Sequence, residues 1–210
     1  PESVPISLSV SGESTTLSLP FIDISNSENG IVPLPVFVSS FFTDVADYYT
    51  HIIAPNGESI PIIAQSGVTD SQLIHVRNVL ENYLTDIPES AMGSNKSPVL
   101  NALSLSNAVL FVLNDPSESD SDEFVSLSEA GAIGQTVFAS EIFPEGVSEY
   151  MSSESRNVTY SAVLRYVHKY GIKNALPSMQ NSIVSLMNDA INNNKFIPAS
   201  DILEEEYDER

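Results

Sequence analysis

The stretch that most constrains the fold is Val158–Phe196, because it carries two amphipathic helical patterns in succession. Apolar residues recur there at the three- and four-residue spacing of one helix face. They are Tyr160, Val163, Leu164 and Val167 in the first half, and Ile183, Leu186, Met187, Ala190 and Ile191 in the second. Between the halves, Gly171 suits the left-handed residue that ends a helix, with Ile172 closing back on Val167. The pattern predicts a C-terminal helical hairpin.

Each apolar stripe of such a hairpin needs a partner to be buried against. Two other parts of the chain offer one: an amphipathic stretch that includes Leu80, and the continuous apolar run Ala108–Leu113. We therefore expect one shared core, made of Leu80, Leu164, Val167, Ile183, Leu186 and Met187 together with Val109 and Phe111.

The first third of the chain has the alternation of β-structure. Apolar residues and serines alternate in Ile6–Ser11, and Thr15–Leu19 can pair with it as a hairpin. A second hairpin is predicted for Tyr48–Ile53 and Ser59–Ala64, which flank a Pro-Asn-Gly turn. The two prolines in Ile31–Phe42 favour an edge or irregular strand there.

Helical signals begin after Gly67. Thr69 and Gln72 fit a capping box, which predicts a helix that begins at Asp70. A short helix is predicted from Ser97 through Leu105, and Ala108–Leu113 suits a strand that is buried on both faces. The segment Phe124–Phe143 has helical spacing weakened by two glycines and stays ambiguous, whereas residues 144–157 are interpreted as a polar linker.

These elements predict an α+β fold: a β-rich segment, residues 1–66, followed by a mainly helical segment, residues 67–210. The helical segment is expected to hold one buried strand and the C-terminal helical hairpin. The two segments form either separate units or one continuous domain.

The charge balance limits the classes of partner. Eight Lys and Arg against 28 Asp and Glu give a net charge of −20, and such a surface repels nucleic acid and anionic lipid. The plausible partners are cations, basic proteins or neutral glycans. The longest apolar run, Ala108–Leu113, is far shorter than the roughly 20 residues of a membrane helix. Cysteine is absent, which excludes disulfide and thiolate chemistry.

An acidic cluster between residues 114 and 123 is the candidate metal site. Its carboxylates are Asp115, Glu118, Asp120, Asp122 and Glu123. Calcium takes about six to eight oxygen ligands from closely spaced carboxylates and carbonyls, so the density suits calcium as the cofactor. The spacing does not match an EF-hand loop, and a solvated acidic loop is the alternative interpretation.

Catalytic signatures are missing from the sequence. The three histidines, His51, His75 and His168, do not have the spacing of an HExxH zinc helix, and packing or surface roles are their default interpretation. The chain also has no GxSxG elbow, P-loop or GxGxxG motif. A carboxylate pair for glycoside hydrolysis leaves no spacing rule in a sequence and stays open.

The order of a capped helix at Thr69–Thr85, a strand at Ala108–Leu113 and a late helical pair resembles the region that precedes the metal helix in some secreted zinc peptidases. This resemblance covers about half of the chain, includes no zinc ligand and transfers no site residue. It implies the non-catalytic front part of such a hydrolase, which is our alternative hypothesis.

Our first hypothesis is an exported, non-catalytic binding or assembly module with a protein or glycan partner. Export, to an extracellular or periplasmic location, is suggested by the Ser-, Thr- and Asn-rich, Lys-poor composition. Because the chain starts at Pro1 without methionine, we also expect a processed piece of a larger precursor.

Overall fold

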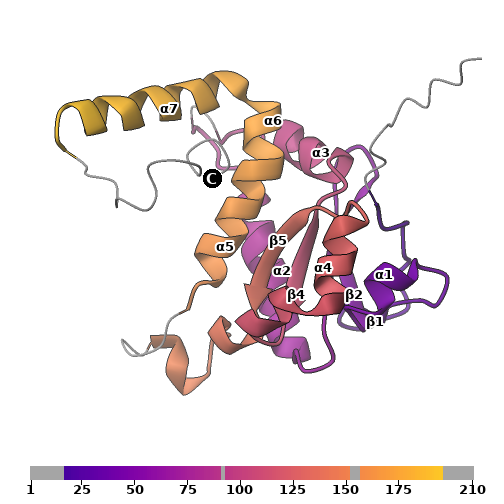
Figure 1. Cartoon of the computed structure of the whole chain (residues 1–210). Helices are drawn as coiled ribbons and strands as arrows, with labels where there is room; N and C mark the ends of the chain where they lie inside the picture. The colour runs from indigo at the N-terminus through magenta and orange to yellow at the C-terminus, as the bar shows by residue number, and fades with distance from the viewer. Residues whose placement is uncertain (1–16, 91–92, 152–156, 196–210) are drawn as a thin grey trace, which may run out of the picture.

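A mixed β-sheet organises the protein, whose computed structural model describes residues 17–90, 93–151 and 157–195 (Figure 1). Within these residues the sheet has five strands in the order β1-β2-β3-β4-β5. They are β1 (Val32–Pro33), β2 (Tyr48–Ile53), β3 (Ser59–Ala64), β4 (Val109–Leu113) and β5 (Gly134–Phe138). The first three strands are antiparallel neighbours, whereas β3, β4 and β5 run parallel.

The connections between the strands contain helices, which confirms the predicted α+β class. They include α1 (Ser40–Thr43), α2 (Asp70–Leu84), α3 (Ser97–Leu105), the 3₁₀ helix η1 (Pro116–Asp120), α4 (Asp122–Glu129) and the 3₁₀ helices η2 (Ala139–Glu141) and η3 (Ser148–Met151). The last part holds α5 (Thr159–Tyr166), the π-helix η4 (Val167–Ile172), α6 (Lys173–Ala175) and α7 (Pro177–Asn192). Three of the five strands therefore lie in the first half of the chain, and the C-terminal end is helical.

The sheet separates two apolar cores. Side chains alternate across a strand, so Leu110 and Val112 point to one face of the sheet, and Val109 and Phe111 point to the other. Helices α2, α3 and α5 with η4 cover the first face, where Leu80 is fully buried. Helices α1 and α4 and the segment before β1 cover the second face.

Several local predictions are confirmed. The β2–β3 hairpin pairs Ile53 with Ser59 across its turn, as the Pro-Asn-Gly signal indicates. Helix α2 begins at Asp70, with both hydrogen bonds of the Thr69–Gln72 capping box present. Strand β4 is buried along its whole length, and β1 forms the edge of the sheet at Pro33.

The ambiguous segment Phe124–Phe143 resolves into a helix and a strand, so the helical half of the chain holds two strands and not one. Gly131 has a φ of +94° directly after α4 and ends that helix. Gly134 opens β5 beside β4, where a Cβ atom would collide with the carbonyl oxygen of Val109. Only glycine fits this close approach, so the two residues that weakened a helical interpretation are the ones that define the break.

The prediction that Gly171 ends a helix is wrong. Gly171 lies inside η4 and is buried, because α5, η4 and α6 form one continuous helical segment. A Cβ at this position would lie 2.8 Å from Cγ1 of Val99 and 3.0 Å from Cγ of Leu103. The glycine therefore serves close packing against α3, and the chain turns only at Leu176, where α7 begins.

The predicted single core is also wrong. Leu80 and Val167 lie in the first core, but Val109 and Phe111 point into the second one, across the sheet. The other four members of the predicted core are not buried: Leu164, Ile183 and Leu186 are exposed, and Met187 is half-buried. Figure 1 shows the reason for the three members on α7, since this helix projects away from the body of the protein and does not fold back onto it.

Two further predictions concern the N-terminal hairpin and the absence of a membrane span. The strand Ile6–Ser11 lies outside the described residues, and residues 17–19 of its predicted partner are not in a strand. No helix in the described ranges has the length and apolar composition to cross a membrane.

Candidate functional site

The five carboxylates predicted as calcium ligands lie in, or directly before, two short helices. Asp115 precedes η1, Glu118 and Asp120 belong to η1, and Asp122 and Glu123 begin α4. Asp115 accepts hydrogen bonds from the side chain and the backbone N–H of Ser117, which hold its pKa below the ordinary value. Glu118 accepts from Nε2 of Gln65 at 2.9 Å.

These protein contacts do not produce a converging set of oxygen ligands. In the described parts of the chain, no group of three or more His, Asp or Glu side chains is placed to hold a metal ion. The calcium site therefore stays a prediction from the sequence.

The three histidines have different surroundings. His51 lies on β2 beneath Phe21, with 5.5 Å between the ring centroids, and faces the second core. His168 lies in η4, and its Nε2 is 2.7 Å from Oε1 of Gln180 on α7. His75 lies on α2 and lines a hollow.

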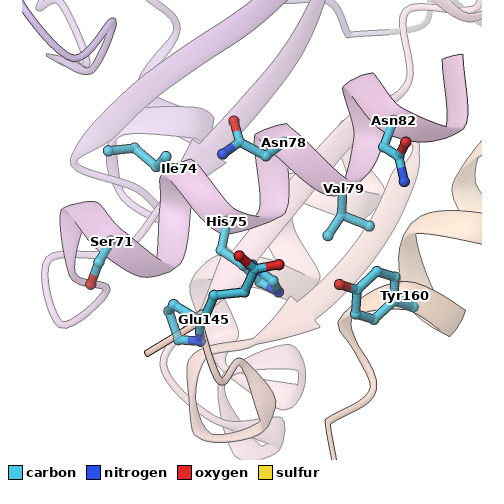
Figure 2. A pocket seen from close by; sticks show the side chains of 9 residues that line it. Ser71, Ile74, His75, Asn78, Val79, Asn82, Glu145 and Tyr160 are labelled. Atoms are coloured by element: carbon cyan, nitrogen blue, oxygen red, sulfur yellow. The ribbon is translucent and has the colours of Figure 1, made fainter. Parts of the chain in front are cut away.

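This hollow has a volume of about 460 Å³ and lies between α2, the loop after η2 and the start of α5 (Figure 2). Helix α2 supplies one wall through Ser71, His75, Asn78 and Asn82, which share one side of the helix because they recur every three or four residues. Figure 2 shows His75 extending from α2 toward the loop that carries Glu145. Tyr160 of α5 lies beyond them, opposite Asn82.

Gln72 of α2 holds the loop that forms the opposite wall of the hollow. Its Oε1 accepts from the N–H of Thr69 in the capping box, and its Nε2 donates to the carbonyl of Ala139 at 2.8 Å. The same Nε2 donates to the carbonyl of Ile142 at 3.4 Å. One side chain therefore both caps the helix and holds the loop that leads to Glu145.

His75 is the most unusual group in the hollow. Its side chain is only 9% exposed, and its Nε2 is buried without a hydrogen-bond partner. Burial lowers the pKa of His75, and the smaller opposing influence of the Glu145 charge does not reverse this. The imidazole is therefore neutral near pH 7, with one nitrogen that donates and one that accepts.

Two tyrosines hold the His75 ring from the side. The ring centroids of Tyr160 and Tyr150 lie 5.9 Å and 6.5 Å from that of His75, in edge-to-face geometry. The hydroxyl groups of the two tyrosines are 3.5 Å apart, and this contact is the main cause that raises the pKa of Tyr160 to about 12. The Tyr160 hydroxyl thus keeps its proton at neutral pH.

Ser71 and His75 do not form a nucleophile–base pair in the hollow. A serine nucleophile needs a base within hydrogen-bond reach, but Ser71 Oγ lies 3.1 Å from Thr69 Oγ1 and forms no hydrogen bond with His75. Asn78 and Asn82 are exposed and have no partner for their side-chain amides among the described residues. The hollow therefore presents free donors and acceptors beside an aromatic ring.

Sequence reasoning missed this site. It gave His75 a packing or surface role by default, and it interpreted the region of Glu145 and Tyr150 as linker. One signal was available: a second, polar stripe at Ser71, His75, Asn78 and Asn82 follows the helix period next to the apolar stripe. The opposite wall leaves no such signal, because the tertiary fold assembles it.

Comparison of the chain with protein-family models, with curated proteins and with solved structures finds no match. The functional argument therefore depends on the geometry of the hollow.

Proposed function

We propose that the protein is an exported, non-catalytic binding module that takes a neutral, hydroxyl-rich ligand, a glycan segment, in the hollow between α2 and α5. The observation that carries this proposal is His75, whose side chain lines the hollow and whose Nε2 is buried without a hydrogen-bond partner. Because this nitrogen has almost no accessible surface, the ring must turn toward the hollow when a ligand binds to it. A buried polar atom without a partner costs free energy, and a ligand hydroxyl that bonds to it removes that cost.

The other groups of the hollow support the same class of ligand. Sugars present hydroxyl groups around an apolar face, and the hollow offers two amides, Asn78 and Asn82, together with the ring of Tyr160. Glu145 is the single charged side chain in its lining. A phosphate or sulfate would meet that carboxylate and a net charge of −20, so an uncharged ligand is favoured.

The shape supports a ligand longer than one sugar unit. A second hollow, of about 400 Å³, shares Ser71 and Pro144 with the first and continues past the N-terminus of α2. Gln72 and Phe143 line this continuation. Two adjoining hollows fit a short chain of units better than a monosaccharide.

The test is a calorimetric or NMR titration with neutral cello-, xylo-, manno- and chito-oligosaccharides. At least one probe should bind and remain chemically intact, and His75→Phe should weaken that binding about tenfold, equivalent to roughly 1.4 kcal/mol. His51→Phe is the matched control, because His51 is also a buried histidine with an unpartnered ring nitrogen but lies on the other side of the sheet. Equal weakening by both variants, or no binding by any probe, would overturn the proposal.

A second variant tests the charge of the ligand. Glu145→Gln should change the affinity for a neutral oligosaccharide by no more than about twofold, because an amide oxygen can replace the carboxylate as acceptor. If the true ligand is cationic, basic tripeptides should bind to the unsubstituted protein more tightly than any neutral sugar, and Glu145→Gln should remove that binding.

A further inference from the structure

Helix α7 exposes an apolar face that no other described part of the chain covers. None of its 16 residues is buried. The exposed fractions are 40% for Ile183, 37% for Val184 and 69% for Leu186, and Met187 and Ile191 are half-buried. Figure 1 shows α7 leaving the helical segment α5–α6 and extending beyond the sheet.

Such a helix needs a partner to be stable. A helix of about 12 to 15 residues is marginal in water by itself, and packing of its apolar face normally supplies most of its stability. Helix α7 also lacks a side-chain cap at its N-terminus. One polar contact anchors α7 to the body: Gln180 lies against Nε2 of His168, near the first turn of the helix.

The charge of the helix indicates what the partner is. The protein carries a net charge of −20, but α7 contains one charged residue, Asp189. A basic partner would find almost no carboxylates to pair with on this helix. A second copy of the chain, in contrast, would meet the least repulsion if it approached through this surface.

We propose that α7 is a dimerisation element, and that two copies of the protein pack their α7 helices antiparallel about a two-fold axis. In such an isologous contact, residues near the axis meet their own copies. Leu186 and Ile183 lie on either side of the middle of α7, and both face the exposed stripe. They would form the centre of the contact.

Size and charge fix the properties of this dimer. A 16-residue helix is about 24 Å long, so one helix pair gives a small interface, of the class that forms weak, reversible complexes. The two acidic bodies repel each other outside the contact. Added salt screens that repulsion, so dimerisation should become stronger as the salt concentration rises.

Sedimentation equilibrium of the full chain, from low micromolar to several hundred micromolar, tests the proposal. The mass should rise with concentration from 22.7 kDa toward twice that value, and the rise should begin at lower concentration in high salt. Leu186→Ser should return the protein to a monomer, whereas Asn181→Ser, on the opposite side of α7, should leave the dimer intact. A monomer at all concentrations and salt levels would overturn the proposal, and so would a dimer that salt dissociates.

Cysteine variants test the geometry, and the absence of native cysteine makes the result unambiguous. Leu186→Cys should form an intermolecular disulfide under mild oxidation far faster than Ser185→Cys, because residue 185 points away from the apolar stripe. Equal rates for the two variants would overturn the antiparallel α7 pair. Far-UV circular dichroism of each variant shows whether the fold is kept.

Discussion

Helices α2 and α7 have nearly the same length and both carry an apolar stripe, yet α2 is packed into the core and α7 is exposed. Helix α2 buries six residues, and the apolar ones, among them Leu73, Val76 and Leu80, pack into the core on the first face of the sheet. Helix α7 buries none. The comparison shows that periodicity predicts a helix and its apolar face, but does not predict whether the partner of that face lies in the same chain.

The N-termini of the two helices differ as well, since α2 has a side-chain cap and α7 has none. Thr69 and Gln72 fix the start of α2 through reciprocal hydrogen bonds, whereas α7 follows Leu176 without a side-chain cap. Local signals and tertiary contacts therefore agree at α2. At α7 only the apolar stripe is present.

The largest expected effect is on the free energy of unfolding, when one apolar side chain is truncated in each helix. Leu80→Ala should lower the free energy of unfolding by about 2 to 5 kcal/mol, because Leu80 is fully buried and its truncation leaves a cavity. Leu186→Ala should change it by less than about 0.5 kcal/mol in dilute, monomeric protein. Urea unfolding of both variants measures the difference. Similar losses would show that α7 folds back onto the body.

The joint that leads to α7 offers the next test. Gly171→Ala should cost about 1 to 3 kcal/mol, because the added methyl group meets Val99 and Leu103 of α3 at the distances given above. Thermal unfolding measures this loss. The double variant Gly171→Ala, Val99→Ala should be less destabilised than the sum of its two single variants. A stabilising Gly171→Ala would instead show that the site has room for a methyl group and that close packing against α3 does not explain the glycine.

The caps provide a smaller effect. Thr69→Ala should cost about 1 kcal/mol through loss of the capping box of α2. Ser178→Ala, in the first turn of α7, is the matched control and should leave stability nearly unchanged, since no side-chain cap exists there. Denaturant midpoints at constant slope give both values. An unchanged midpoint for Thr69→Ala would contradict the role of the cap.

The smallest expected effect is a pH dependence of stability that comes from His75 on α2 and His51 on β2. Burial lowers the pKa of His75 and His51 in the folded protein below the ordinary value of 6.5. The unfolded chain therefore binds more protons as the pH falls through 6.5, and stability present above that pH is lost below it. His75→Phe should reduce this acid-side loss, while the exposed apolar face of α7 contributes nothing to it. Identical melting curves from pH 7.5 to 5.5 for the variant and the parent would contradict the proposed neutral His75.

The sequence predicted those parts of the fold that depend on neighbouring residues. The α2 start at Asp70, the β2–β3 hairpin and the buried strand β4 all follow from caps, turns and alternation. The prediction failed where a distant contact decides. Gly134 and Gly171 are glycines because Val109 and α3 approach them closely, and no local pattern records such an approach.

The candidate site was less predictable than the fold for the same reason. His75, Asn78 and Asn82 could be placed on one side of α2 from their spacing alone. Glu145 and Tyr160 reach the hollow only through the path of β5, which was ambiguous in the sequence, and through the Gln72 clamp. The sequence likewise shows a high density of carboxylates at Asp115–Glu123, but it could not show whether their oxygens converge on one metal ion.

The order of the parallel strands has a consequence for the handedness of the chain. From β3 to β4 to β5 the strands advance in one direction across the sheet, but α2 and α3 lie on one face and α4 lies on the other. Two crossovers that step the same way on opposite faces have opposite hands, so one of them is left-handed, a hand found in about 2% of such connections. Doubly wound sheets cover both faces by reversing the strand order. This protein covers both faces by changing the hand of a crossover instead.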